Sequence, residues 1–349
     1  MDPAVQVTGL TKRFGGIAAV DDLSFEVRSG EFFAFLGANG AGKSTTIGCL
    51  TTTLPFDHGA ITVAGHEVGP DNDSIRRSIG VLFQQSVLDP RLTVRENLAS
   101  RAGLYGINRV DAASRITRLA TQAGLTGFLD QRYGTLSGGQ RRRADIARAL
   151  IHSPAVAFLD EPTSGLDPTS REQIWKTIND LRQEEGVTIF LTTHYLEEAD
   201  PADQVLVIGK GREVAKGTPI ELRERFSTSV LTLVPATGLT NAVTEALERR
   251  SLAAQGTPAG LRLEVDGAAQ ALELLAELTP NLADFEFRHG SMDDVFLALT
   301  NDESDTGTQT AASAARATRE PKAKARAKPK PGTNPRRPAN TRHPGGGTQ

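Results

Sequence analysis

The chain has 349 residues, of which 38% are hydrophobic, 23% charged and 5% aromatic, and its formal net charge is −3. This composition is typical of a globular protein with an aliphatic core, and the length allows one large domain plus a smaller one. No stretch approaches the roughly 20 apolar residues that span a bilayer, and the first residues lack the features of a signal peptide, so we expect no membrane-spanning segment.

The first predicted elements in chain order are strands. Residues 5–7 and 23–27 alternate between apolar and polar side chains, which predicts strands of an antiparallel edge sheet. Residues 32–36 form a continuous apolar run, which predicts a buried core strand, and residues 44–50 are expected to open a helix. Cys49, the only cysteine, lies in that helix and is interpreted as a small packing residue rather than a redox or catalytic group.

Between this core strand and this helix lies a glycine-rich loop with the pattern G-x-x-x-x-G-K-[ST]. Its residues are Gly37, Ala38, Asn39, Gly40, Ala41, Gly42, Lys43, Ser44 and Thr45. A loop that joins a strand to a helix directs several backbone N–H groups at one point, which suits a phosphate. Lys43 would then reach the β- and γ-phosphates, and Ser44 would hold Mg²⁺. The alternative, a glycine-rich turn without a ligand, does not explain the full pattern in this context.

A second group of motifs follows in the middle of the chain. Residues 79–83 predict a strand that ends at Gln84, and residues 94–150 are mainly helical in pattern. Residues 136–140, Leu-Ser-Gly-Gly-Gln, precede a basic helical run, and residues 156–159 predict a buried strand that ends at Asp160 and Glu161. A carboxylate at such a strand end, beside a phosphate loop, suits Mg²⁺, and Glu161 is placed to polarise a water. The pentapeptide alone could be only a helix N-cap, but its position between the other motifs favours a functional role.

The remainder of the chain predicts three further parts. Strands are expected at residues 187–191, 205–208 and 213–215, and then a small α+β unit at 228–300 with strands at 230–234, 261–265 and 285–287 and helices at 240–250, 268–278 and 291–300. This unit is either a structural or dimer-contact domain or a ligand sensor. Residues 301–349 carry a formal charge of +6 against −9 for residues 1–300, and their composition predicts a disordered basic tail.

Taken together, the motifs resemble those of the nucleotide-binding subunit of ABC transporters. The matching residues are Phe14 for the aromatic that stacks on adenine, Gly37 to Thr45 for Walker A, Gln84 for the Q-loop, Ser137, Gly138, Gly139 and Gln140 for the signature, Asp160 for Walker B, Glu161 for the catalytic glutamate, Asp167 for the D-loop and His194 for the switch histidine. Residues 192–200 and the three arginines after the signature are similar to the drug-, polysaccharide- and haem-exporting group. Residues 291–300 are similar to the C-terminal end of the daunorubicin-resistance type.

The resemblance implies a fold and a domain organisation. The fold is α/β, a P-loop NTPase (RecA-like) core with an antiparallel β edge sheet and a helical subdomain at about residues 85–150. The ATP-binding domain would cover residues 4–226, followed by the accessory domain at 228–300 and the disordered tail at 301–349.

The resemblance also implies a function, ATP hydrolysis that powers an ABC exporter of a drug, antibiotic or other amphiphile. The cofactors are ATP and Mg²⁺, with Glu161, His194 and Lys43 as catalytic residues and Ser44, Gln84 and Asp160 as metal ligands. The expected partners are a second copy of the chain and separate transmembrane permease subunits that dock near residues 84–100, at the cytoplasmic face of the cell membrane.

Two points stay open in this interpretation. The alternative function is a soluble ABC ATPase of DNA repair or translation, although the long coiled-coil insertion or second cassette typical of such proteins is not visible. The basic tail is either a solvated segment without a specific partner or a contact to anionic lipid. Nucleic acid is not expected, because the tail has no stacking aromatic residue.

Overall fold

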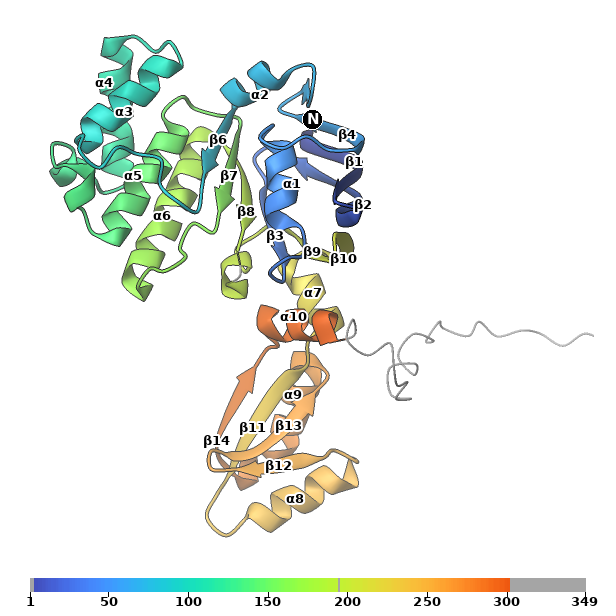
Figure 1. Ribbon diagram of the computed structural model, residues 1–349. Helices are drawn as coiled ribbons and strands as arrows, with labels where there is room; N and C mark the ends of the chain where they lie inside the picture. The colour runs from blue at the N-terminus through green and yellow to red at the C-terminus, as the bar shows by residue number, and fades with distance from the viewer. Residues whose placement is uncertain (1–2, 194, 302–349) are drawn as a thin grey trace, which may run out of the picture. The chain divides into compact units, whose positions relative to one another are not determined.

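The computed structural model describes residues 3–193 and 195–301 (Figure 1). The strands are β1 Pro3–Phe14, β2 Ile17–Arg28, β3 Phe32–Gly37, β4 His58–Val63, β5 His66–Glu67, β6 Ile79–Leu82, β7 Val156–Asp160, β8 Thr188–Thr192, β9 Gln204–Gly209, β10 Arg212–Gly217, β11 Ser229–Pro235, β12 Ala254–Thr257, β13 Gly260–Val265 and β14 Leu282–Arg288. The α-helices are α1 Lys43–Leu50, α2 Asn72–Ser78, α3 Val94–Leu104, α4 Arg109–Gln122, α5 Gly138–Leu150, α6 Pro168–Glu185, α7 Pro219–Phe226, α8 Thr240–Arg249, α9 Gly267–Leu278 and α10 Met292–Asn301. Short 3-10 helices are η1 Thr126–Phe128, η2 Tyr133–Thr135, η3 Leu196–Ala199 and η4 Thr279–Asn281.

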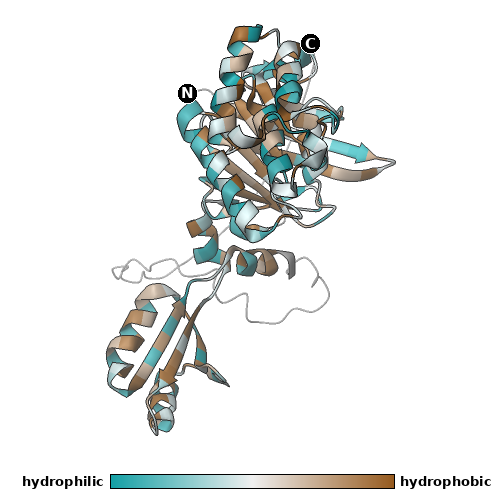
Figure 2. Ribbon diagram, turned by 90° about the vertical axis from the view of Figure 1, so that its left-hand side faces the viewer, coloured by the Kyte–Doolittle hydropathy of each residue, from teal (hydrophilic) through white to brown (hydrophobic). Residues whose placement is uncertain are grey.

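A six-stranded sheet forms the centre of residues 3–226, which we call the cassette. Its strand order is β10-β9-β3-β8-β7-β6, and all neighbours are parallel except β10 and β9. Every residue of β3 is buried, because both faces of the sheet are covered (Figure 2). Phe32, Ala34 and Leu36 pack on the side of α3 to α6, and Phe33 and Phe35 pack on the side of α1 and the edge sheet. This alternation fixes the direction in which β3 delivers the loop that follows it.

A second, antiparallel sheet with the order β2-β1-β4-β5 covers the α1 side. The strands predicted at 5–7 and 23–27 lie in β1 and β2, which pair antiparallel as expected, whereas β4, β5 and α2 were not predicted.

Cys49 is fully buried in the core between this sheet and the central one, as expected for a packing residue. Burial raises the pKa of its thiol to about 11, so the thiolate that reacts is scarce at neutral pH.

The helices on the other side of the central sheet begin at well-defined caps. Thr93 and Ser137 each form a capping box at the start of α3 and α5, and the Asn108 side chain accepts from Val110 N and Asp111 N at the start of α4. These caps satisfy backbone N–H groups that a helix start leaves without partners. The predicted helical content of residues 94–150 is confirmed by α3, α4 and α5, whereas α6 and α7 were not predicted.

Residues 229–288, which we call the accessory domain, form an antiparallel sheet with the order β12-β13-β11-β14. Alternate residues of β11 and β13 share an apolar core with α8 and α9. The predicted strands and helices of this unit are present to within one residue at each end, except that β14 begins three residues before the predicted start, and β12 is an addition. The last helix, α10, contributes Met292, Val295 and Leu299 to the cassette core, where they join residues of α7 and η3.

The P-loop NTPase fold predicted from the sequence is confirmed, with its antiparallel edge sheet and small α+β appendage. The exact domain boundaries stay predictions. The predicted tail, 301–349, lies almost wholly outside the described residues. Within the described part of the chain, each helix is too short or too polar to cross a bilayer.

Candidate nucleotide site

The phosphate loop is held between β3 and α1 by close backbone approaches. Gly42, directly before α1, has φ 108°, and a Cβ there would lie 2.4 Å from the carbonyl oxygen of Ala19. At Gly37 a Cβ would lie 2.6 Å from the carbonyl oxygen of Ile208. Any side chain at these two positions would displace backbone, so the loop conformation depends on glycine.

Lys43 lies at the start of α1 and is only 8% exposed. Its ammonium donates to the carbonyl oxygens of Gly37, at 2.6 Å, and Ala38, at 3.2 Å. Burial lowers the pKa of Lys43, and the nearby carboxylates of Glu161 and Asp160 act in the opposite direction. The Lys43 ammonium therefore lies inside the curve of the phosphate loop.

The end of β7 supplies the two carboxylates. Asp160 Oδ1 accepts a hydrogen bond of 2.6 Å from Thr192 Oγ1 on the neighbouring strand β8. Glu161 follows with φ 47°, a conformation that non-glycine residues adopt rarely, and its N–H donates to the Thr192 carbonyl at 3.0 Å. Local strain of this kind is found preferentially at functional sites.

A cavity of about 160 Å³ brings the loop and the two carboxylates together. Its lining consists of Ala19, Asn39, Gly40, Gly42, Lys43, Ser44, Thr45, Asp160 and Glu161. All but one of these were predicted from the sequence. Ala19 comes from β2 and carries no motif signal, because it enters the site only through the packing of the edge sheet on the loop.

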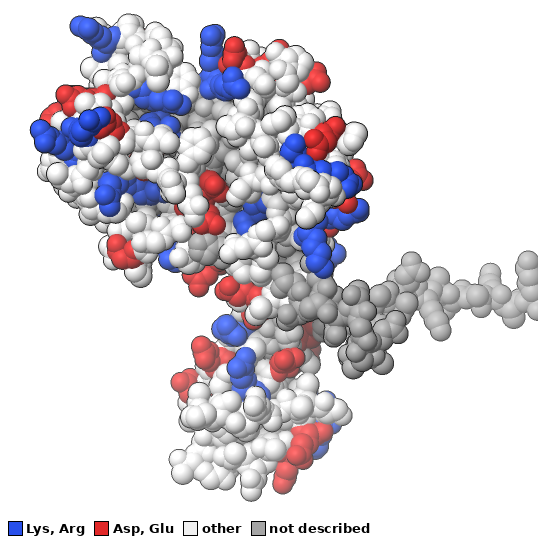
Figure 3. Space-filling model, viewed as in Figure 1, with Lys and Arg blue, Asp and Glu red and all other residues white. Residues whose placement is uncertain are grey.

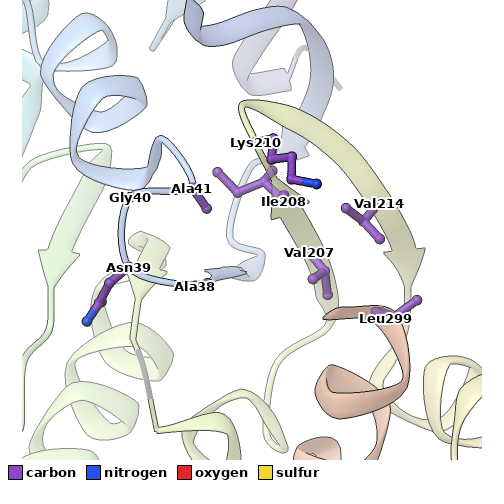
Figure 4. Close-up of a pocket in the computed structure, with 10 residues that line it drawn as sticks. Ala38, Asn39, Gly40, Ala41, Val207, Ile208, Lys210, Val214 and Leu299 are labelled. Carbon is purple, nitrogen blue, oxygen red and sulfur yellow. The ribbon is translucent and has the colours of Figure 1, made fainter. Parts of the chain in front are cut away.

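Ala38 and Ala41 line a different cavity, of about 220 Å³, which Asn39 and Gly40 also border (Figure 4). Its other walls are Val207, Ile208, Gly209, Lys210 and Val214 of β9, β10 and their turn, and Leu299 of α10. This space is mainly apolar and none of its lining residues is acidic, so we assign phosphate chemistry to the first cavity.

Gln84 and Phe14 lie outside the lining of the first cavity. Gln84 follows β6, and its side-chain Nε2 donates to Glu161 Oε2 at 3.3 Å, so the structure does connect it to the Glu161 carboxylate. Phe14 ends β1 and is 50% exposed, with the Lys12 ammonium 5.4 Å from the ring centroid. An exposed ring is free to stack, and its contact with adenine stays a prediction.

The signature residues begin α5. Ser137 is the N-cap: its Oγ accepts from Gln140 N at 3.3 Å, and Gln140 Oε1 accepts from Ser137 N at 2.9 Å. The helix-cap interpretation considered from the sequence is therefore correct locally, and it leaves N–H groups of the first turn directed outward. In the part of the chain that the structure describes, Ser137, Gly138, Gly139 and Gln140 do not line the cavity of Lys43.

The D-loop residue Asp167 is also a helix cap. Its carboxylate accepts from Ser170 N at 2.9 Å and Ser170 Oγ at 2.6 Å at the start of α6, and these bonds lower its pKa. A Cβ at Gly139 would lie 2.6 Å from Ser170 Oγ, so the first turns of α5 and α6 are packed tightly together. His194 lies outside the described residues, and its predicted role stays a prediction.

A buried carboxylate that sequence reasoning did not single out lies beside the predicted switch segment. Glu198 of η3 accepts from the hydroxyls of Thr163 and Thr193 and from Trp175 Nε1. It thereby ties the residue before His194 to the segment after Glu161. Its only sequence signal was its place in the run of residues 192–200.

Charged side chains of both signs are interspersed over the viewed face of the cassette (Figure 3). Within the described residues, no cluster of three or more His, Cys, Asp or Glu side chains could hold a metal ion.

The geometry agrees with comparisons to known proteins. Residues 20–164 match the protein family described as ABC transporter. The daunorubicin/doxorubicin resistance ATP-binding protein DrrA of Streptomyces peucetius is 40% identical over 314 residues, which cover 86% of this chain and 94% of that protein. The linearmycin resistance ATP-binding protein LnrL of Bacillus subtilis is 34% identical over 85% of this chain and 98% of its own length.

Among solved structures, a dimeric post-hydrolysis state of the ATP-binding cassette MJ0796, bound to ADP and Pi, is similar to this chain. It has a TM-score of 0.55 and 28% identity, and covers 61% of this chain and 98% of the cassette. The similarity to DrrA extends over most of both sequences. The chain therefore belongs to the ATP-binding subunits of ABC transporters, ATPases that act with membrane permease subunits, and within them to the group of the daunorubicin-resistance proteins.

Proposed function

We propose that this chain hydrolyses Mg²⁺-bound ATP to drive export of a drug-like or antibiotic amphiphile through separate membrane subunits. The cargo class is carried over from the resistance proteins to which the chain is similar. The observation that carries the site assignment is the cavity that joins Lys43 and Ser44 to Asp160 and Glu161.

The charged residues of the cavity would have distinct roles in phosphoryl transfer to water. Lys43 and the N–H groups at the start of α1 would bind the β- and γ-phosphates and offset their charge. Glu161 would accept a hydrogen bond from the attacking water and orient it, and Gln84, 3.3 Å from that carboxylate, helps to fix its position. His194 would contact the γ-phosphate, as the resemblance implies.

The residues available for Mg²⁺ fit that ion. Ser44 and Asp160 line the same cavity and offer a hydroxyl and a carboxylate, and Gln84, whose side chain donates to Glu161, would add its amide oxygen. Mg²⁺ prefers oxygen ligands, and it commonly takes one or two carboxylates together with substrate phosphates. The ion, when bound, would neutralise charge that develops on the transferred phosphate.

The complete site requires a second copy of the chain. One chain carries one phosphate loop and one signature, and Ser137 and Gly139 lie on α5 rather than in the lining of the Lys43 cavity. The capped start of α5 offers N–H groups to an anion. We therefore assign the signature to the ATP of the partner, which makes each site a shared one.

A groove of about 490 Å³ is the proposed docking surface for a membrane subunit. It is lined by Thr51, Thr53, Asp73, Arg76, Arg77, Ile79, Val81, Phe83, Arg101, Leu104 and Tyr105. Leu104 is 76% exposed and Phe83 40%, and three arginines face one aspartate. An amphipathic helix with an acidic side chain would complement this groove. The groove lies next to residues 84–100, which the resemblance implied as the docking surface, since its lining includes Phe83 and Arg101.

We place the chain at the cytoplasmic face of the membrane through this docking. The basic residues of the tail could add affinity for anionic lipid, at about 1 kcal/mol for each Lys or Arg near the surface. Truncation after Thr306 should leave ATPase activity unchanged and weaken binding to anionic liposomes at low salt. Loss of activity in a folded truncated protein would contradict the assignment of the tail.

The direct test of the function is Glu161→Gln. The variant should bind ATP with wild-type affinity but lose about 100-fold or more in turnover, because an amide cannot accept the proton of the attacking water. Steady-state ATPase rates and calorimetry measure both quantities. Glu213→Gln, the same change at an exposed position of β10, is the matched control and should retain full activity. Turnover of the Glu161 variant within about twofold of wild type would remove Glu161 from the mechanism.

A further inference from the structure

The guanidinium of Arg142 is bound to the backbone on both sides of the catalytic carboxylate. Arg142 is the middle one of three consecutive arginines, lies in the second turn of α5 and is only 8% exposed. Its Nε donates to the Pro162 carbonyl at 2.6 Å, and its Nη2 donates to the carbonyls of Asp160, at 3.0 Å, and Glu161, at 2.7 Å.

The remaining nitrogen of Arg142 binds a second segment. Nη1 donates to the carbonyls of Phe83, at 2.6 Å, and Gln84, at 3.5 Å. A guanidinium has five N–H donors in a planar fork, and here five carbonyl oxygens receive them. One side chain thus joins the segment after β7, which contains Glu161, to the segment after β6, which contains Gln84.

Other contacts of α5 make this connection rigid. Asp145 Oδ1 accepts from Ser86 Oγ at 2.6 Å, and its Oδ2 accepts from Tyr133 Oη at 3.0 Å. Arg148 donates to the carbonyl of Val81. The second half of α5 is therefore hydrogen-bonded to β6 and to the segment after it. Arg142 alone of these side chains also binds the backbone around Glu161.

The charge balance explains why an arginine can be buried here. Burial lowers the pKa of Arg142, and the carboxylates of Asp145 and Asp160 act in the opposite direction. Carbonyl dipoles at the carboxyl ends of two parallel strands complete the solvation of the cation. A lysine would keep the charge, but its three N–H groups on a flexible stem cannot reproduce the planar fork.

We infer that Arg142 is a positioning residue, which transmits the position of the signature helix to Gln84 and Glu161 of the same chain. Ser137 to Gln140 begin α5, and Arg142 follows within the next turn, so a displacement of the signature displaces the guanidinium. When the signature closes on the ATP of the partner, the carbonyls of both catalytic segments move with α5. Each chain would thereby link the two ATP sites of the dimer, an inference that rests on the shared-site function proposed above.

The test replaces Arg142 by Lys and by Gln in the full chain. Both variants should bind ATP within about threefold of wild type, because Arg142 does not line the nucleotide cavity, while the turnover number falls about 20-fold or more. The dependence of the rate on ATP should lose its cooperativity, with a Hill coefficient near one. A residue needed only for folding would not separate binding from turnover in this way.

Arg143 provides the matched control. It is the next residue of the same helix, and its Nη1 also donates to two carbonyls, those of Ala123 at 3.2 Å and Gly124 at 3.3 Å, which lie at the end of α4. Arg143→Lys and Arg143→Gln should keep turnover and cooperativity within about twofold of wild type, even where the melting temperature falls.

Several outcomes would overturn the inference. It is wrong if folded Arg142→Gln or Arg142→Lys turns over ATP at the wild-type rate with wild-type cooperativity. It is also wrong if Arg142→Lys fails to fold while Arg143→Lys folds, because Arg142 would then be structural only. Equal rates for the wild type and Glu161→Gln would instead overturn the proposed function, and this inference with it.

Discussion

The cassette and the accessory domain differ in what they bury. Within the described residues, the buried polar and charged side chains lie between Thr11 and Glu198, all in the cassette, and they include Lys43, Arg142 and Asp145. The core of the accessory domain consists of apolar residues of β11, β13, α8 and α9. The cassette therefore places polar and charged groups in its interior, whereas the core of the accessory domain is apolar.

Buried charge and buried apolar area affect stability in different ways. Removing a charge from water costs several kcal/mol per ion unless good geometry compensates for it. The cassette buries charges where they hold the segments of the ATP site, as Asp145 and Arg142 hold the residues after β6. The core of the accessory domain, in its described part, is apolar, and burial of this area is its main source of stability.

The largest expected effect comes from breaking the buried charge cluster. Asp145→Ala should lower the free energy of unfolding of the cassette by about 3–5 kcal/mol, because it removes a carboxylate that compensates the buried charges of Arg142 and Arg148. Ser86 and Tyr133 would lose their hydrogen-bond acceptor as well. Urea unfolding, followed by the fluorescence of Trp175 in the cassette, measures the loss.

The matched change in the accessory domain is Glu277→Ala. Glu277 pairs with Arg250 at 2.6 Å, but both side chains are more than 40% exposed. Solvent screening reduces such a pair to about 0–1 kcal/mol. If the two substitutions destabilise the protein equally, the proposed difference between the regions is wrong.

The next effect concerns the cation of the phosphate loop. Lys43→Ala should weaken ATP binding by about 2–3 kcal/mol, roughly 30- to 150-fold, because a charge-assisted contact to the phosphates is lost. Calorimetric titration with ATP gives the affinity. Lys210→Ala, at the turn after β9, is a control that should bind ATP normally. Unchanged affinity in the Lys43 variant would show that the loop is not used as proposed.

A smaller effect is expected from His152, at the end of the cassette helix α5. Its Nε2 lies 2.9 Å from the Ile79 carbonyl and its ring stacks on Tyr105, and burial lowers its pKa from 6.5 to about 4. Between these values the unfolded chain binds a proton that the folded chain does not, so stability is full above pH 6.5 and falls as the pH drops towards 4.

At about 1.36 kcal/mol for each pH unit between the two values, this contribution amounts to about 3 kcal/mol at most. His152→Gln should flatten the pH dependence of the free energy of unfolding in that range. Denaturation midpoints measured at several pH values would reveal it. An unchanged slope in the variant would mean that His152 does not titrate as its burial implies.

The same contrast explains how much could be predicted from the sequence. In the accessory domain, apolar periodicity predicted β11, α8 and α9 to within one residue at each end, because burial alone determines the pattern. In the cassette, the loop and the strand-end carboxylates were predicted because their motifs are local. The position of Arg142 could not be predicted in this way, because three consecutive arginines are typical of a solvated helix face. Only the packing of α5 against the ends of β6 and β7 buries the middle arginine.

Other omissions have equally physical reasons. Ala19 approaches the loop only through sheet packing, and β12 lacks apolar alternation because it is a largely exposed edge strand. Helix α6 did have a readable signal, with Asp167 as N-cap, Pro168 in the first turn and Gly186 at the C-terminal end, but Asp167 was interpreted only as a D-loop residue. A helix cap and a functional residue can be the same side chain.

The central claim is that two copies of the chain share each ATP site, and a mixing experiment tests it most directly. Ser137→Arg alters the signature, and Glu161→Gln alters the catalytic carboxylate, so each variant alone should be inactive. A mixed dimer contains one site with both residues intact, formed by Glu161 of the first variant and Ser137 of the second. We predict that mixing restores ATPase activity, up to about half of the activity per mixed dimer. No recovery, from variants that are folded and shown to form mixed dimers, would contradict the shared site.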